Sequence, residues 1–246
     1  MRKMEGASTE GLLMFAPKAF KPLYFFLRLA KNPDELGRVF QMRNASVSPV
    51  MTRLIRARLR EEPQGRKAMD ENIRLGTFTM DELFAFPENS LGHAYARFMK
   101  RNGLSPDAIP RPENGNYVQS HLYETHDLWH VLTGFGVDVA GEAGLQAVYA
   151  AQLPGALPAA LVSAILLNAA IARSGVKTKE RFDAIARGWT MGSRARSIFG
   201  YDFRKNFARP LEDVRTELDI DASLSVPGPL RGALTLEDEK LLDRAA

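Results

Sequence analysis

The sequence predicts an all-α protein in which a single domain is built from many helices. Apolar residues recur at spacings of three and four, as in Leu211, Val214 and Leu218, and this spacing places them on one helical face. No stretch shows the sustained two-residue alternation of a half-buried strand. With 246 residues, 45% of them hydrophobic, the chain is large enough to bury one well-packed core.

The first quarter of the chain is basic. Residues 1–67 contain 14 Lys and Arg against 6 Asp and Glu, whereas the remainder is net acidic. A basic segment indicates an anionic partner such as a membrane surface or a nucleic acid, with a solvated basic face as the alternative. No nucleic-acid-reading motif accompanies the arginines of residues 48–61, so nucleic acid is not an expected partner.

Helices are expected within this basic segment at residues 33–42 and 48–61. Residues 15–31 interleave Phe, Tyr and Leu with Lys and Arg, a mixture that suits the interface of a bilayer. A helix that packs these aromatic residues into the core is the alternative. We therefore predict that residues 1–75 form a basic helical segment that contacts a membrane.

Caps and helix breakers set the expected boundaries in the centre of the chain. Ser90 suits the N-cap of a helix that runs through Met99. Residues 103–116 are rich in Pro, Gly and Asn and predict a loop. Residues 117–133 contain neither Pro nor Gly and predict one helix, and a second helix is expected from about residue 141 to 152 after a glycine-rich turn.

Residues 153–172 are apolar enough to raise the question of a membrane span. Two prolines, Asn168 and many alanines argue against a span and favour a buried helix. An amphipathic helix is expected at residues 179–199 around Trp189, and a short helix after Pro210. We predict that residues 76–220 form the core of the fold. Residues 221–246 are expected to be a tail with a short helix.

The chain contains no cysteine, which excludes disulfides, thiolate metal ligands and thiol nucleophiles. Its first twenty residues lack the long apolar stretch and cleavage site of a secretory signal peptide. We therefore expect a cytoplasmic location.

Two histidines four residues apart mark the most informative segment. His126 and His130 share one helical face, with Cβ atoms about 5–6 Å apart, so two ring nitrogens can converge on one cation. Asp127 lies at the edge of that face, where it is a third ligand or orients an imidazole. Glu142 follows three glycines that allow the chain to reverse, and an antiparallel second helix brings its carboxylate to the histidines.

Two imidazoles with one or two carboxylates suit zinc, iron or manganese and leave positions open for water or substrate. The alternative is that His126 and His130 are hydrogen-bonded inside the core without a metal. We expect His93 and His121 to be structural or solvated. The segment 126–130 also resembles the zinc-protease signature, in which a Glu acts as general base on a metal-bound water. The Asp at that position here is one methylene shorter and reaches that water poorly, so peptide hydrolysis is disfavoured.

The order His126, Asp127, His130, eleven further residues and Glu142 resembles the hallmark of the ubiquinone (coenzyme Q) biosynthesis family that is named for the fourth Coq protein. The similarity includes the run HDLWHVLTGFGVDVAGE and extends over about residues 80–220, with weaker flanking matches such as Pro87–Gly92 and Gln152–Pro154. The resemblance does not place the first 75 residues.

The resemblance implies an all-helical fold and a divalent metal, with His126, Asp127, His130 and Glu142 as metal-binding and catalytic residues. It implies oxidative removal of the C1 carboxyl of a polyprenylated hydroxybenzoate, which a hydroxyl replaces. It further implies contact with a polyprenylated aromatic lipid, with other ubiquinone biosynthesis enzymes and with the inner face of the cell membrane. The alternative function is a prenyl-lipid-binding scaffold that organises those enzymes around a structural metal. The sequence leaves a homodimer open.

One departure from the family pattern precedes the metal motif. Where the family has Arg-Tyr-Arg-Glu, this chain has His121-Leu122-Tyr123-Glu124, so both arginines are missing. The substrate group that such arginines would meet is an anionic one, such as a carboxylate or a phosphate. His121 is expected to replace them in part when protonated.

Overall fold

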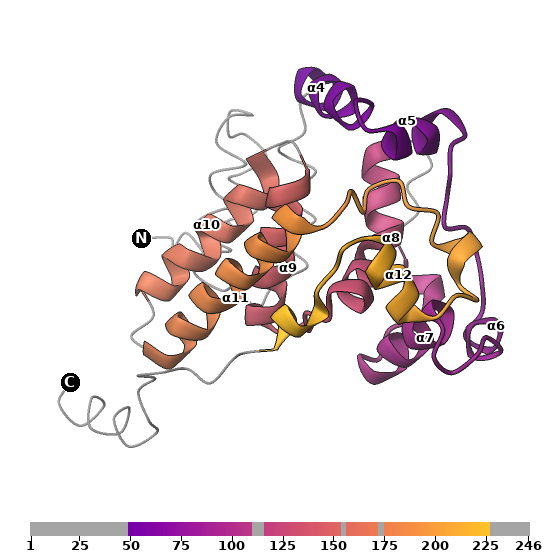
Figure 1. Ribbon diagram of the computed structural model, residues 1–246. Coiled ribbons are helices and arrows are strands. Elements are labelled where there is room, and N and C mark those ends of the chain that lie inside the picture. The colour runs from indigo at the N-terminus through magenta and orange to yellow at the C-terminus, as the bar shows by residue number, and fades with distance from the viewer. Residues whose placement is uncertain (1–48, 110–115, 154–155, 172–174, 227–246) are drawn as a thin grey trace, which may run out of the picture.

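The computed structural model describes residues 49–109, 116–153, 156–171 and 175–226. Throughout these ranges the regular elements are helices, and the strand-like pairing there is one isolated bridge between Ser90 and Pro210 (Figure 1). This confirms the predicted all-α fold. The aromatic segment 15–31, the helix predicted at 33–42 and residues 227–246 of the predicted tail lie outside the described residues.

Described residues 49–109 contain the α-helices α4 (Pro49–Leu59), α5 (Pro63–Asp70), α6 (Met80–Phe84) and α7 (Leu91–Arg101). The helix predicted at 48–61 is α4. A capping box between Thr79 and Glu82 starts α6. Ser90 caps α7 as predicted, because its side chain accepts a hydrogen bond of 3.2 Å from the His93 N–H. The predicted loop holds the short 3-10 helix η1 (Pro106–Ala108).

The metal motif lies on α8 (Tyr117–Thr133) and α9 (Val139–Gln152), with a glycine-containing turn between them. The bounds of α8 are those predicted from its lack of Pro and Gly. It ends at Gly134, whose φ of +79° lies in the left-handed region that glycine adopts most readily. The start of α9 is two residues earlier than predicted because the Asp138 side chain caps its first turn.

Two further helices, α10 (Ala156–Ile171) and α11 (Gly175–Arg194), pack beside α9 (Figure 1). The helices α9 and α11 approach closely because each has a glycine at the contact. A Cβ atom on Gly188 would overlap the carbonyl oxygen of Gly144. This contact fixes the position of α9, and therefore of the side chains that α9 presents to α8.

The helix predicted to be buried, α10, is only partly buried. Its buried side chains include Leu161, Ala164 and Ile165, and its half-buried side chains include Val162, Leu166 and Leu167. The reason is that its packing within the described residues is against α9 and α11. On α11, Phe182 and Trp189 are exposed, with 52% and 54% of their surface accessible. None of the described helices combines the length and the apolar character that crossing a bilayer requires.

The described chain ends with η2 (Arg204–Asn206), α12 (Leu211–Glu217) and η3 (Ala222–Ser225). The short helix predicted after Pro210 is α12. Its Arg215 donates hydrogen bonds of 2.9 Å to the carbonyl oxygens of Val131 and Leu132. These carbonyls belong to the last turn of α8, where a helix has no partners of its own for them. Arg215 therefore holds the end of α8 that carries His130.

Candidate metal centre

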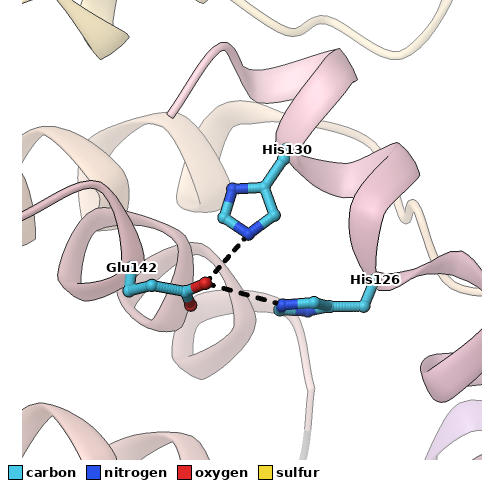
Figure 2. Close-up of side chains that lie close together, drawn as sticks. All are labelled: His126, His130 and Glu142. Atoms are coloured by element: carbon cyan, nitrogen blue, oxygen red, sulfur yellow. Dashed lines mark hydrogen bonds and ion pairs between the residues drawn. The ribbon is translucent and has the colours of Figure 1, made fainter. Parts of the chain in front are cut away.

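Three of the four predicted site residues converge. His126 and His130 extend from α8 and Glu142 from α9, and their candidate ligand atoms all lie within 4.8 Å of one another (Figure 2). The Nε2 atom of His130 is 3.1 Å from Oε1 of Glu142, and Nε2 of His126 is 3.8 Å from the same oxygen. The predicted approach of Glu142 to the two histidines is therefore present in the structure.

Both imidazoles turn Nδ1 away from Glu142. Nδ1 of His130 lies 2.9 Å from the carbonyl oxygen of Phe135. Because a carbonyl only accepts, Nδ1 carries a proton and donates, which leaves Nε2 as the lone-pair nitrogen when the ring is neutral. Nδ1 of His126 lies 3.2 Å from the hydroxyl of Tyr149. The bond from Nδ1 of His130 to a backbone carbonyl is the arrangement that metal-ligating histidines usually have in proteins.

The electrostatics of the cluster favour an ionised carboxylate. Burial raises the pKa of Glu142, but hydrogen bonds from His126 and His130 outweigh this effect, and the net pKa lies well below its ordinary range. Burial lowers the pKa of His130, and the Glu142 carboxylate raises it more, so its net pKa is raised. Without a metal, the ionised Glu142 carboxylate therefore favours a proton on His130, and a divalent cation at the same place would supply the positive charge instead.

Access to the cluster is one-sided. The His130 side chain is 1% exposed and that of Glu142 10%, whereas that of His126 is 32% exposed. Phe98 stacks on the His130 ring at 5.5 Å between centroids. Solvent therefore reaches this cluster along the side of His126.

Asp127 is not part of the converging group. It lies half-buried on α8, next to His126, and its charge contributes to the raised pKa of His130. Two imidazoles with outward-bonded Nδ1 atoms and one ionised carboxylate are the donor set that zinc, iron(II) and manganese(II) accept. The residues of the cluster therefore fit a divalent metal of this kind.

The other two histidines lie outside the cluster. Nδ1 of His93 is 3.1 Å from the carbonyl oxygen of Phe86. His121 is buried, and its Nε2 accepts a hydrogen bond of 3.1 Å from the Gly200 N–H. Burial lowers the pKa of His121 to about 4. The expectation that a protonated His121 replaces the missing arginines is therefore wrong, because this ring is neutral in the folded protein near pH 7.

The neutral state of His121 makes the stability of the fold pH-dependent. Its pKa is about 4 in the folded protein against 6.5 ordinarily. Above pH 6.5 the histidine is neutral in both the folded and the unfolded chain, and the free energy of unfolding is unaffected. As the pH falls from 6.5 towards 4, the unfolded chain takes up a proton that the folded protein does not, and the free energy of unfolding decreases by an amount on the order of 3 kcal/mol. Urea denaturation is expected to show that the free energy of unfolding decreases more between pH 7 and pH 4 in the wild type than in His121→Gln, because the glutamine amide does not titrate. Equal declines would contradict this assignment.

The structure reveals polar support that the sequence motif did not specify. Glu124 is buried and forms an ion pair with Arg74, and one of its carboxylate oxygens accepts a hydrogen bond of 3.1 Å from the Leu75 N–H. This pair fastens the chain before α6 to α8.

Tyr149, whose hydroxyl lies beside Nδ1 of His126, is a second residue near the cluster that the sequence motif did not include. Its position could have been predicted from the sequence, because it follows Glu142 by seven residues and therefore lies on the same face of that helix.

The fold and the cluster define an all-helical protein with a partly buried His-His-Glu group of metal-binding composition. The sequence profile of the family described as Coenzyme Q (ubiquinone) biosynthesis protein Coq4 matches residues 26–223. The chain belongs to this family, which confirms the resemblance drawn from the motif and places the chain among proteins of ubiquinone biosynthesis.

Individual relatives agree with this assignment. A ubiquinone biosynthesis protein coq4, mitochondrial, from Penicillium rubens is 27% identical over 199 residues, which cover 77% of this chain and 68% of that protein. A COQ4 homologue of Danio rerio, also named mitochondrial, is 29% identical over 200 residues, covering 78% and 72%. A crystal structure of a Nostoc punctiforme protein assigned to ubiquinone biosynthesis superposes with a TM-score of 0.71 at 26% identity, covering 82% of this chain and 98% of that one.

Proposed function

We propose that this protein is a metal-dependent enzyme that exchanges the C1 carboxyl of a polyprenylated hydroxybenzoate for a hydroxyl. The observation that carries the proposal is the convergence of His126, His130 and Glu142 within 4.8 Å in a member of a ubiquinone biosynthesis family. In the exchange the ring–carboxyl bond breaks and carbon dioxide leaves. Water supplies the hydroxyl, and dioxygen accepts the two electrons and two protons that are released.

His126, His130 and Glu142 would hold the metal, and their donor atoms suit zinc, iron or manganese. A metal bound there supplies Lewis-acid or redox chemistry to a phenolate or carboxylate of the substrate. The aromatic ring of the substrate enters at the exposed side of His126. On the other side of the metal site, the buried side chains of His130 and Glu142 exclude bulk water. Asp127 acts from its place beside His126, as a fourth ligand or as an orienting group.

Contact with lipid fits the surface of the α9–α11 layer. The apolar residues of α10 are only partly covered within the described residues, and α11 exposes Phe182 and Trp189. In this proposal the apolar surface of residues 144–172 shelters the prenyl tail, and the basic first segment touches the inner face of the cell membrane. The protein thus works at the membrane, from the cytoplasmic side, beside the other ubiquinone biosynthesis enzymes.

Glu142→Ala separates this enzyme from a scaffold whose metal is only structural. The test is complementation of a bacterial strain that lacks its own enzyme for the C1 step, with ubiquinone measured by mass spectrometry. We expect the wild type to restore ubiquinone and Glu142→Ala to fail, because a ligand to the reacting metal is gone.

The matched control is Glu88→Ala, which removes an exposed carboxylate before α7 and is expected to complement fully. Circular dichroism verifies that each variant remains helical. Full complementation by a folded Glu142→Ala variant would support the scaffold and overturn the enzymatic proposal.

A further inference from the structure

The two imidazoles of the cluster share a pattern that involves a side chain with no assigned role. In each ring Nε2 lies towards Glu142 and Nδ1 lies towards an oxygen outside the cluster. For His130 that oxygen belongs to the backbone of Phe135, which no substitution removes. For His126 it is the hydroxyl oxygen of Tyr149, at 3.2 Å, on the neighbouring helix α9.

Tyr149 is held firmly enough to orient another side chain. It is 5% exposed and its ring stacks on that of Trp129, with 4.3 Å between the centroids and an angle of 25°. Trp129 is itself fully buried on α8. The Tyr149 ring also lies nearly parallel to that of His126, at 6.0 Å and 10°. The phenol therefore contacts one face of the cluster from a fixed position.

His126 needs this support more than His130 does. Its side chain is 32% exposed, whereas that of His130 is 1% exposed and packed against Phe98. An imidazole on an accessible surface samples several ring orientations and both neutral tautomers unless a hydrogen bond selects one. The tautomer with its proton on Nδ1 leaves the Nε2 lone pair on the side of Glu142, where it can bind a cation that lies between the two side chains, and an acceptor beside Nδ1 favours that tautomer.

We infer that Tyr149 is a positioning residue for metal binding: its hydroxyl oxygen accepts the hydrogen bond of the His126 Nδ1–H. In this way it holds the Nε2 lone pair in the cluster. This inference rests on the proposed metal-dependent function and names a residue outside the metal motif. Glu142 and Tyr149 lie on one face of α9, so this helix supplies both a ligand and the group that orients another ligand.

Tyr149→Phe tests the inference, because it keeps the ring stacked on Trp129 and removes the hydroxyl alone. Affinity for Co²⁺ and Zn²⁺ is measured on the full chain by competition with a chelator, and the visible spectrum of the Co²⁺ form reports the ligand arrangement. We expect metal affinity to fall by roughly 10- to 100-fold, as is typical when a group that orients a ligand is lost. The visible bands are expected to shift, and the metal-free protein is expected to keep its helical content.

Tyr117→Phe is the matched control. Its hydroxyl also lies near a histidine Nδ1, at 3.3 Å from that of His121, but this histidine lies outside the cluster. We expect the metal affinity of this variant to equal that of the wild type. Equal affinities for wild type and Tyr149→Phe would overturn the inference while leaving the metal site intact. A wild type that binds neither ion would overturn the proposed function and this inference together.

Discussion

His130→Ala is expected to abolish metal binding and, with it, turnover of the ring carboxyl. His130 is the most buried imidazole of the cluster, and its Nε2 lies 3.1 Å from Glu142. The substitution leaves one imidazole and one carboxylate, too few protein ligands to hold zinc or iron(II) firmly. We expect a loss of affinity greater than about 100-fold, because the loss of a group that only orients a ligand already costs about 10- to 100-fold.

Elemental analysis of protein purified without a nickel column measures this effect, alongside an assay of carboxyl loss from a prenylated hydroxybenzoate. The matched control is His93→Ala, which removes a half-buried histidine of α7 that bonds the Phe86 carbonyl and lies outside the cluster. This control is expected to retain both metal and activity. A His130→Ala variant that is free of metal and fully active would refute the proposed mechanism.

Gly188→Ala is expected to destabilise the fold and weaken the metal site, although the residue touches no ligand. The new methyl group would overlap the Gly144 carbonyl oxygen, which belongs to the backbone of α9 and cannot move by a change of side-chain rotamer. The helices α9 and α11 must therefore separate. Overpacking of this kind costs about 1–3 kcal/mol and occasionally more. Because Glu142 lies two residues from Gly144, a shift of α9 also moves its carboxylate away from His130.

Urea denaturation gives the change in unfolding free energy, and a Co²⁺ titration of the same samples gives the change in affinity. Gly103→Ala is the control, because no atom lies within 4 Å of the new methyl group there. Its φ of +63° adds a strain of only about 1 kcal/mol, with no expected effect on metal affinity. Unchanged stability and affinity in Gly188→Ala would show that the close contact between these helices is unimportant.

Local chemistry explains why the central helices were predictable. The bounds of α8 follow from a run without Pro or Gly between Asn116, a capping residue, and Gly134, a helix-ending one. The pairing of His126 with His130 follows from their spacing on that helix. Glu142 was harder to place, because its approach depends on how the turn after α8 directs the next helix. The resemblance to the family motif, in which a Glu follows the second His after eleven residues, is what assigned Glu142 to the site.

Features that depend on contacts between distant segments could not be read from the sequence. The burial of His121 and its hydrogen bond from Gly200 arise from two segments 79 residues apart. The partial exposure of α10 depends on which neighbours cover it, and its apolar composition carries no such information. Tyr149 shares a face with Glu142 by spacing alone, but its role depends on the position of His126 across the interface. Asp127 remains a prediction as a ligand, since the converging group does not include it.

The metal content of the wild-type protein tests the central claim most directly. The protein is purified from cells without an affinity-column metal and analysed for zinc, iron and manganese by mass spectrometry, with Glu142→Ala prepared in parallel. The site defined by His126, His130 and Glu142 predicts about one divalent ion per wild-type chain and almost none in the variant, as expected for three protein ligands around one ion. A wild-type protein that carries no divalent metal, and gains none from added zinc, iron(II) or manganese(II), would contradict the account.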